Sequence, residues 1–504
     1  MSLYRALLDA AERRPERIAL HGDDGRALTH AALHEEASRI AGALREAGVG
    51  PGDRVTVQVE KSFSAVALYL AVLRAGAVFQ PLNSAYTEAE LAYFVGDAEP
   101  RVLVCDPARA EALAPIAAEH DARLRTLAAD GRGTLIDAAR AATPAPPVPG
   151  ADDALAAVLY TSGTTGRSKG AMLTHGNLLS NARTLRRCWG WRDDDVLVHA
   201  LPIHHVHGLF VALHCALLEP GTLWFLERFD AERVLARLPE ATVYMGVPTH
   251  YVRLLAEPGL DRARCASMRL FVSGSAPLRP ETFAAFEART GHRILERYGM
   301  TEAGMITSNP LDGDRVPGSV GYPLPEVELR LRTPEGDPVE EGGVGVLEVR
   351  GPNVFPGYWR LPERTASEFR DGWFVTGDLA TRDPDGRVHI VGRHRDLIIS
   401  GGLNVYPKEI EAELDALPGV LESAVIGVPH PDFGEAVVAV AVTGEGWSGE
   451  EDARGRLRER LAAFKVPKRI VPADALPRNA MGKVQKNLLR EAHSELFADA
   501  PSPG

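Results

Sequence analysis

The stretch LYTSGTTGRSKGAMLTH, residues 159–175, places a loop rich in glycine, serine and threonine between two apolar runs. The runs, ALAAVLY at 154–160 and AML at 171–173, are typical of buried strands, so the loop is held at both ends. A flexible linker has a similar composition but lacks such flanks. A loop held between strands exposes backbone N–H groups that bind anions such as phosphate. The Walker pattern is not satisfied, because Lys169 is preceded by a serine and followed by a glycine, so the sequence predicts a phosphate loop of another kind.

Outward from this loop, helical patterns alternate with short apolar runs. Three consecutive segments show this alternation: LHEEASRIAGALREAG at 33–48, RVTVQV at 54–59 and SAVALYLAVLRAGAVF at 64–79. The spacing is that of βαβ units and predicts a mostly parallel sheet with helices on its faces. We therefore expect an α/β fold whose large N-terminal domain is built from doubly layered α/β sheets.

The pattern changes after about residue 315, where short strands are broken by glycine and proline. Two segments, GVGVLEVRGPNVFPGYW and GWFVTGDLATRDPDGRVHIVG, are typical of a small β-rich unit, and we expect a β-barrel-like unit at about 315–395. A compact α/β pattern then begins near residue 396. The sequence thus predicts an N-terminal domain, 1–395, and a small C-terminal lobe, 396–504.

Composition narrows the class of protein. The 504 residues are 45% hydrophobic and 25% charged, as in an ordinary globular protein, and the net charge of −12 argues against nonspecific binding to nucleic acid. The four cysteines are scattered, which fits reduced thiols in a cytosolic protein better than a disulfide framework. The first twenty residues predict an amphipathic helix rather than a signal peptide, and no run approaches 18 apolar residues. We expect a cytoplasmic protein with neither nucleic-acid nor membrane partners.

Four further motifs carry polar groups suited to a nucleotide. In ERYGMTE, Tyr298 is suited to stacking on a planar base and Glu302 to binding Mg²⁺. In FVTGDL, Asp378 follows a glycine turn and is suited to accepting hydrogen bonds from vicinal ribose hydroxyls. VGRHRDLIISGG contains Arg393, and LPRNAMGKVQK contains Lys483 in a proline- and glycine-rich loop. Each residue alone is more typical of a solvated surface position than of a functional site, so only their combination in one order indicates a site.

In this order, YTSGTTGRSKG, YGMTE, TGD, GRHRD and NAMGK resemble the signature of the acyl-adenylate-forming superfamily, which includes acyl-CoA synthetases. The resemblance covers nearly the whole chain. Within the superfamily, PLNSAYTEAEL, TSNPLDGDRVPGSVG and SGGLNVYPKEIEAELDALPGVLESAVIGVPHPDFGE are most similar to malonyl-CoA synthetases. The resemblance implies two steps: a carboxylate attacks the α-phosphate of ATP, giving acyl-AMP and pyrophosphate, and the thiol of coenzyme A then displaces AMP.

The resemblance also implies roles for individual residues and the use of ATP, Mg²⁺ and coenzyme A. The β- and γ-phosphates are assigned to the loop residues Thr161, Ser162, Gly163, Thr164, Thr165, Gly166 and Lys169. Mg²⁺ is assigned to Thr161 and Glu302, and the α-phosphate to Thr301. The remaining nucleotide contacts are assigned to Gly274, Ser275, Ala276, Tyr298 and Gly299 around the base and to Asp378 and Arg393 at the ribose.

Lys483 has the most demanding implied role. A carboxylate and an α-phosphate repel one another, and an ammonium between them offsets this repulsion in the transition state. In the resembled family the C-terminal lobe is mobile: it turns about a hinge, matched here by Asp396, and Gly402 then lies beside the pantetheine arm of coenzyme A. An exposed Lys483 is also a target for a lysine acetyltransferase, and acetylation would remove the charge that the first step needs.

The choice of acid depends on Arg297, which directly precedes Tyr298. A buried guanidinium is costly beside a fatty or aromatic acid but forms a bidentate pair with the spare carboxylate of a diacid. The alternative is that Arg297 pairs with Glu296 or faces solvent. The resemblance favours the ligand role and malonate as the acid, with methylmalonate as a second candidate because one methyl group changes binding by only about 1–3 kcal/mol.

The segment LPIHHVHGLF places His205 and His207 in what the resemblance implies is the wall of the acid pocket. Both are suited to donating a hydrogen bond to a carboxylate, and packing without contact is an equally good interpretation. Their spacing is not that of a usual zinc site. The rival interpretations of the whole chain are a CoA ligase for another short or aromatic acid and a nucleotide-binding regulator without catalysis.

Overall fold

The computed structural model describes residues 2–161, 168–400, 403–430, 433–479 and 482–497. It divides into two compact units, Met1–Leu329 with Val349–Phe374, and Arg330–Glu348 with Val375–Gly504. Residues 330–348 and 375–395, which belong to the β-rich segment, thus form one compact unit with the C-terminal residues. The predicted domain boundary at Arg395–Asp396 stays a prediction.

The first sheet of the larger unit carries the loop quoted above. Its seven strands lie in the order β18-β8-β7-β4-β3-β5-β6. Pairing is parallel from β7 to β6, whereas β8 is antiparallel to β7 and to β18. The expected strands on either side of the loop are therefore present as the antiparallel pair β7–β8. The bounds are β3 (Arg54–Gln58), β4 (Val78–Pro81), β5 (Val102–Cys105), β6 (Arg123–Thr126), β7 (Leu155–Thr161), β8 (Lys169–Thr174) and β18 (Gly357–Tyr358).

The second sheet of this unit has nine strands in the order β15-β14-β13-β12-β11-β9-β10-β1-β2. The six strands from β13 to β1 are parallel, and the pairs at both ends are antiparallel. In such sheets ligands bind beyond the carboxyl ends of the parallel strands. The bounds are β1 (Ile18–His21), β2 (Ala27–Thr29), β9 (Val196–His199), β10 (Thr222–Phe225), β11 (Val243–Gly246), β12 (Leu270–Ser273), β13 (Leu295–Met300), β14 (Gly304–Ser308) and β15 (Tyr322–Pro323).

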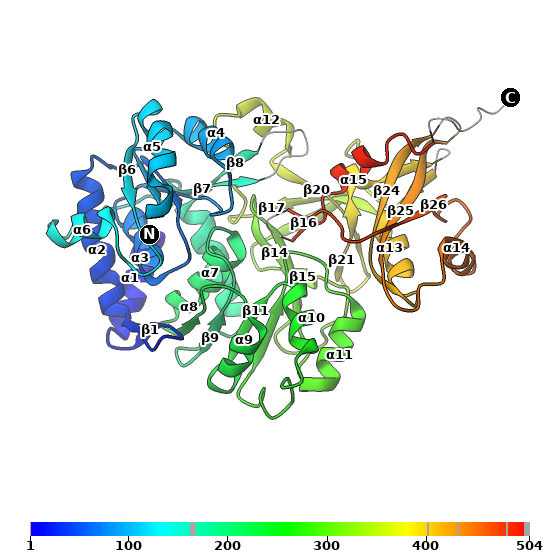
Figure 1. Cartoon of the computed structure of the whole chain (residues 1–504), viewed down its shortest axis with the longest axis horizontal. Coiled ribbons are helices and arrows are strands. Elements are labelled where there is room, and N and C mark those ends of the chain that lie inside the picture. The colour runs from blue at the N-terminus through cyan, green and yellow to red at the C-terminus, as the bar shows by residue number, and fades with distance from the viewer. Residues whose placement is uncertain (1, 162–167, 401–402, 431–432, 480–481, 498–504) are drawn as a thin grey trace. The chain divides into compact units, whose positions relative to one another are not determined.

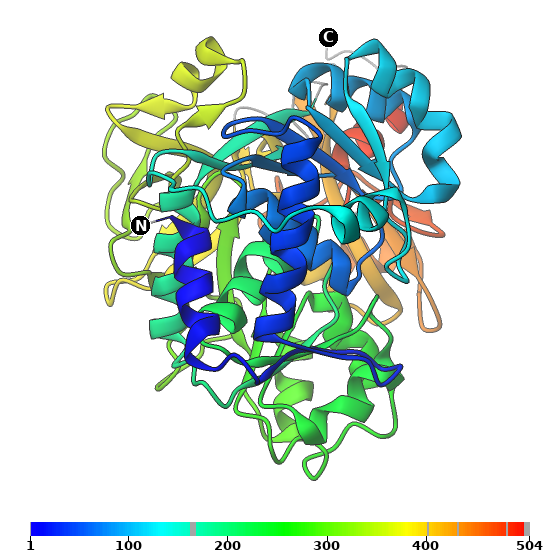
Figure 2. The same ribbon diagram turned by 90° about the vertical axis from the view of Figure 1, so that its left-hand side faces the viewer.

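Helices cover these sheets (Figure 1), and their burial follows from their sequences. Helix α3 (Phe63–Arg74) is apolar on all sides and is buried from Ala65 to Leu73, whereas α1 (Leu3–Arg13) buries one apolar face. Figure 2 shows α1 beside α2 (His30–Glu46), which in turn contacts α3. The other helices are α4 (Glu88–Ala98), η1 (Pro107–Arg109), α5 (Ala110–Glu119), α6 (Thr134–Ala141), α7 (His175–Cys188), η2 (His207–Leu213), α8 (His214–Leu218), α9 (Ala231–Arg237), η3 (Leu238–Glu240), α10 (Pro248–Ala256), α11 (Pro280–Thr290) and α12 (Pro362–Ser367).

A separate five-stranded sheet forms the β-rich segment, and it confirms the small β unit expected there. Its strands follow the order β16-β17-β20-β19, with β21 paired to β20. Glycines and prolines interrupt the sequence between these strands, which explains their short lengths. The bounds are β16 (Glu328–Arg332), β17 (Gly345–Arg350), β19 (Phe369–Arg370), β20 (Trp373–Arg382) and β21 (Val388–Arg393).

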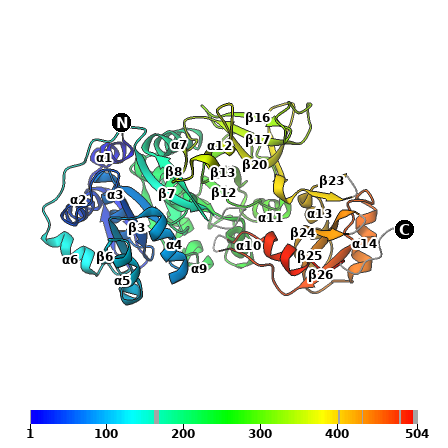
Figure 3. The same cartoon turned by 90° about the horizontal axis from the view of Figure 1, so that it is seen from above.

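The C-terminal lobe is a small α/β layer. Its strands follow the order β23-β22-β25-β24, and β26 pairs with β25. Alternate residues of β25 belong to two different apolar clusters, one containing Ile410 of α13 and the other Leu489 of α15, so the sheet is covered on both faces. Figure 3 shows α13 and α14 beside this sheet. The bounds are η4 (His394–Asp396), β22 (Ile398–Ser400), β23 (Leu403–Val405), α13 (Pro407–Asp415), β24 (Val420–His430), β25 (Gly434–Thr443), α14 (Glu450–Arg458), β26 (Arg469–Ala473) and α15 (Lys486–Ala492).

No helix within the described part of the chain is long and apolar enough to cross a membrane.

Candidate active site

The ends of the β7–β8 pair carry the first two candidate residues. Thr161 is the last residue of β7 and lies opposite Lys169, the first residue of β8. The loop that they bound is the one predicted to hold phosphates. Five of its predicted contacts lie outside the described residues: Ser162, Gly163, Thr164, Thr165 and Gly166.

Glu302 lies in the tight turn between β13 and β14 and is buried. Its Oε1 accepts a hydrogen bond from Thr161 Oγ1 at 3.3 Å and another from the Tyr358 hydroxyl at 3.1 Å. Burial and the neighbouring Glu302 carboxylate raise the pKa of Tyr358, so its hydroxyl keeps its proton and donates. The structure thus brings together the two residues predicted to contact Mg²⁺, Thr161 and Glu302.

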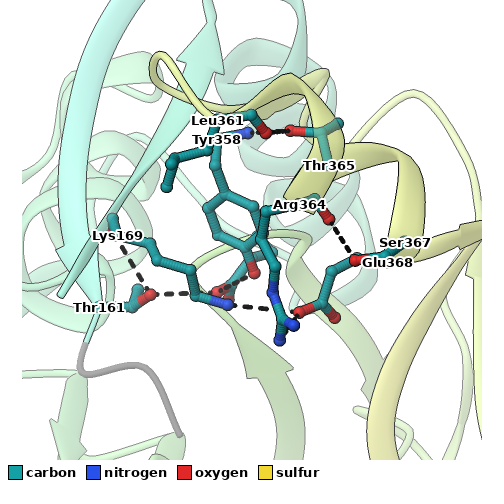
Figure 4. A network of polar contacts seen from close by, with 9 residues as sticks. Thr161, Lys169, Tyr358, Leu361, Arg364, Thr365, Ser367 and Glu368 are labelled. Carbon is teal, nitrogen blue, oxygen red and sulfur yellow. Dashed lines mark hydrogen bonds and ion pairs between the residues drawn. The ribbon is translucent and has the colours of Figure 1, made fainter. Parts of the chain in front are cut away.

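Lys169 lies in the same network (Figure 4). Its Nζ is 3.3 Å from Oε1 of Glu368 and 4.2 Å from the centre of the Tyr358 ring, and Arg364 also pairs with Glu368 at 2.5 Å. An acidic side chain, Glu368, therefore pairs with two cations near the start of β8. The sequence analysis missed Tyr358, Arg364 and Glu368, because no local spacing links them to residues almost 200 positions earlier.

The residues predicted to border the base gather at the carboxyl ends of two neighbouring strands. Gly274, Ser275 and Ala276 follow β12, and Tyr298 and Gly299 lie in β13, which is parallel to β12. A Cβ atom on Gly299 would lie 2.2 Å from the Gly304 carbonyl oxygen, so this hairpin requires glycine. Tyr298 is partly buried rather than fully exposed.

Thr301, predicted to contact the α-phosphate, lies in the turn after β13. It lines a small pocket together with Val206 and Phe210.

Arg297 extends from β13 and is 4% exposed, which rules out a solvent-facing side chain. Its guanidinium lies against the backbone of Gly274, where an added Cβ would be 2.4 Å from Arg297 Cζ. Its Nε and Nη2 are buried, and among the described residues they have no hydrogen-bond partner. Burial lowers the pKa of Arg297 to about 9, because water no longer solvates the charge. Such a group is costly unless a ligand pairs with it.

His207 lies near Arg297, whereas His205 has a different neighbour. The Nδ1 of His207 is 3.2 Å from Ser275 Oγ, and its Nε2 is buried with no hydrogen-bond partner among the residues that the structure describes. Burial and, next, the charge of Arg297 lower the pKa of His207 well below its ordinary value, so the ring is neutral. The His205 ring instead packs edge-on against His204, with 4.3 Å between ring centres.

The smaller unit holds the remaining candidates. Asp378 and Arg393 face each other across β20 and β21, and Nε of Arg393 is 2.8 Å from Asp378 Oδ1. This pair presents a buried carboxylate beside a partly exposed guanidinium, which is a suitable donor and acceptor set for ribose hydroxyls.

The predicted hinge residue Asp396 pairs with Arg490 of α15 at 2.6 Å. Lys483 is exposed, and its backbone N–H and C=O are both bonded to Asn479, which closes the loop around it. Gly402, predicted to lie beside coenzyme A, is outside the described residues.

Comparison with known proteins identifies the family. The AMP-binding enzyme family matches residues 7–359, and the AMP-binding enzyme C-terminal domain matches residues 409–483. The chain belongs to the AMP-binding enzyme family. This confirms the resemblance to adenylate-forming enzymes and the expected fold class, and it makes the protein an AMP-forming acid–CoA ligase that uses ATP and coenzyme A.

Several relatives of this family match over nearly their whole length. A feruloyl-CoA synthase of Amycolatopsis sp is 40% identical, over 93% of this chain and 94% of that one. A mitochondrial malonate–CoA ligase of Mus musculus is 38% identical, over 94% of this chain and 87% of that one. The crystal structure of ATP-bound MatB from Rhodopseudomonas palustris is 53% identical, with a TM-score of 0.96 over 99% of this chain and 100% of that one.

Proposed function

We propose that this enzyme is a malonyl-CoA synthetase that recognises the spare carboxylate of the diacid with Arg297. The observation that carries the proposal is that Nε and Nη2 of Arg297 are both buried and have no hydrogen-bond partner in the described part of the chain. These lie on one edge of the guanidinium and form the fork that binds a carboxylate with two parallel hydrogen bonds.

The same fork binds carboxylates elsewhere in this chain. Arg269 donates from Nε and Nη2 to the two oxygens of Asp195, and Arg350 donates from Nε and Nη2 to the two oxygens of Glu328. Arg297 differs in being buried without a described carboxylate on that edge. A diacid supplies that carboxylate, and a monocarboxylic acid leaves the charge unpaired.

The surroundings of Arg297 also favour a small polar acid. His207 is neutral, with a buried Nε2, and Ser275 lies beside its other ring nitrogen. These polar groups complement a carboxylate, whereas an aromatic ring placed against them would leave them without hydrogen-bond partners. The malonate–CoA ligase of mouse and MatB of R. palustris support the proposal, whereas the feruloyl-CoA synthase supports the alternative of an aromatic acid.

In the proposed first half-reaction, the acid attacks the α-phosphate of ATP while the side chains of this chain hold the charges. Thr161 and Glu302 present hydroxyl and carboxylate oxygens 3.3 Å apart, a set that fits Mg²⁺, which would neutralise phosphate charge. Lys169 holds the departing pyrophosphate, Asp378 holds the ribose, and Lys483 offsets the repulsion between the two reacting anions.

In the proposed second half-reaction, the C-terminal lobe turns about Asp396, and the thiol of coenzyme A displaces AMP from the acyl group. The exposed Lys483 is also the proposed target of an acetyltransferase, which mass spectrometry of the native protein tests directly. A cytoplasmic location is part of the same proposal, and fractionation of the source cells tests it.

The function is tested by comparing malonate, methylmalonate, succinate, acetate, octanoate and ferulate as substrates. Pyrophosphate release measures the first half-reaction, and mass spectrometry identifies the thioester formed with coenzyme A. We expect the highest kcat/KM with malonate and measurable turnover of methylmalonate. A preference for acetate, octanoate or ferulate would contradict the role of Arg297, and ATP binding without pyrophosphate release from any acid would favour a regulator.

A further inference from the structure

A lysine with no role in the reaction described above is buried in the larger unit. Lys61 lies just before α3, and 7% of its surface is exposed. Its Nζ is 2.8 Å from Nδ1 of His199, 2.7 Å from the His199 carbonyl oxygen and 2.6 Å from the Leu226 carbonyl oxygen. The Gly208 carbonyl oxygen, 2.9 Å from His199 Nε2, can only accept, so the single proton of the neutral His199 ring lies on Nε2 and Nδ1 is an acceptor. Lys61 therefore has three acceptors, and only the ammonium form carries the three N–H protons that they require. The ring of Phe225, 4.2 Å away, further favours a cation.

The position of this cation is unusual for a lysine, a residue that is almost never fully buried unless it is paired. Burial lowers the pKa of Lys61 well below its ordinary value, so retaining the charge here costs free energy. The carbonyl groups that it contacts belong to His199, the last residue of β9, and to Leu226, which directly follows β10, and these two strands are parallel neighbours. This is the sheet edge at which ligands bind in such folds.

His199 links Lys61 to the segment that carries the proposed acid-binding residue His207. The proton of its neutral ring is assigned to Nε2, because that nitrogen donates to the Gly208 carbonyl oxygen at 2.9 Å, and this assignment leaves Nδ1 to accept from Lys61. Gly208 is the second residue of η2, a π-helical segment, a form that is frequent at functional sites. A Cβ atom on Gly208 would lie 2.0 Å from the Pro202 carbonyl oxygen, so the backbone of this turn is tightly packed.

The turn fixed in this way begins with His207. That ring contacts Ser275, and the charge of Arg297 contributes to keeping it neutral. The hydrogen-bonded line from Lys61 through His199 to Gly208 therefore ends one residue from the wall of the proposed acid site.

We infer that Lys61 is a positioning residue for the acid-binding site: through His199 it fixes the turn that carries His207, and it does not touch the acid. This inference rests on the proposed function, because it takes His207 and Arg297 as the residues that face the acid. Lys61 is thus a third buried residue, besides Arg297 and His207, on which binding of the acid depends.

The steady-state test uses Lys61→Met, which keeps the length of the side chain and removes the charge and all three donors. We expect KM for the acid to rise at least tenfold while KM for ATP stays within twofold of the wild type. The acid in this test is malonate or, if the substrate panel shows another preference, the acid that the wild type converts best. A failure of the proposed function can therefore be distinguished from a failure of the inference about Lys61. Lys465→Met, which removes a lysine paired with Glu409 on the C-terminal lobe, is the matched control and should change neither constant.

Rescue by a conservative variant separates positioning from simple packing. In His199→Gln the amide oxygen can accept from Lys61 and the amide nitrogen can donate to Gly208, so we expect an acid KM within threefold of the wild type. His199→Leu breaks both contacts and should match Lys61→Met, and the double variant should be no worse than either single one. Additive losses, or equal losses in His199→Gln and His199→Leu, would overturn the inference.

A spectroscopic measurement on the wild-type enzyme tests the hydrogen bond between Lys61 and His199 even if Lys61→Met does not fold. The ring ¹⁵N signals of His199 in the wild-type enzyme, assigned with His199→Gln, should show an unprotonated Nδ1 and a protonated Nε2. A protonated Nδ1 would overturn the inference without any further variant. An unchanged acid KM in folded Lys61→Met would overturn it as well.

Discussion

Replacing Arg297 by methionine should lower the activity with malonate and, at the same time, raise the stability of the ligand-free enzyme. The substitution removes the two donors on the unpaired edge of a side chain that is 4% exposed. Leaving the partner of a buried charge pair unpaired costs about 3–5 kcal/mol. At about 1.4 kcal/mol for each factor of ten, kcat/KM for malonate should fall by roughly 140- to 3,700-fold.

The same change should stabilise the enzyme when no acid is bound. The guanidinium is buried with its Nε and Nη2 unpaired among the described residues, and an apolar side chain avoids that desolvation cost. We therefore expect Arg297→Met to unfold at a higher temperature than the wild type, as measured by differential scanning fluorimetry without ligands. Acetate has no second carboxylate for Arg297 to bind, so its kcat/KM should stay close to the wild-type value.

The assay is initial-rate pyrophosphate release at several concentrations of malonate and of acetate, with ATP saturating. Arg350→Met is the matched control, since it removes a carboxylate-bound arginine that is half exposed and outside the candidate site. It should leave both rates unchanged. A fall of less than tenfold with malonate, or an equal fall with malonate and acetate, would refute the reasoning.

Three further outcomes are expected. Lys483→Ala should block pyrophosphate release yet largely spare thioester formation from supplied acyl-AMP, and equal loss of both steps would contradict a mobile lobe. Glu368→Gln should lower KM for ATP severalfold, because Lys169, now 3.3 Å from that carboxylate, would be released for phosphate; a higher KM would count against it. The free energy of unfolding should fall steeply as the pH drops below 6.5, since unfolding lets buried neutral histidines take up protons, each contributing up to about 1.4 kcal/mol per pH unit. A melting temperature that is unchanged down to pH 5 would contradict this. Burial lowers the pKa of these rings to about 3 or 4: His34, His175, His204, His214 and His250.

Much of the fold could be predicted from the sequence, because runs and spacings of apolar residues indicate buried strands and helices locally. The glycine-rich loop has apolar flanks, and these flanks form β7 and β8 as expected. The continuous apolar run of α3 marks a helix buried on all sides. The C-terminal unit was harder, because compactness groups residues 330–348 with it, and no local feature of those residues indicates that association.

The candidate site was predictable where one motif supplies neighbouring groups and unpredictable where distant segments meet. Residues on β13 and the end of β12 come together because parallel strands place their carboxyl ends at one edge. The contact of Glu302 with Tyr358 and of Lys169 with Glu368 depends on the pairing of β18 with β8, which sequence spacing does not encode.

Burial of single charged residues was also beyond local patterns. Lys61 stands in the polar stretch VEKS, which suggests a solvated lysine, and its burial against His199 and Leu226, more than 130 positions later, has no local signal. Likewise the sequence could not distinguish His205 from His207. The π-helical segment begins at His207 and places that ring beside Ser275.

The central claim is that Arg297 binds the spare carboxylate of a diacid, and a crystal structure with an unreactive malonyl-adenylate analogue tests it most directly. We expect both Nε and Nη2 of Arg297 within about 2.7–3.2 Å of the two oxygens of the free carboxylate. An analogue whose free carboxylate is ordered against other groups, with that edge of Arg297 still unpaired, would contradict the claim.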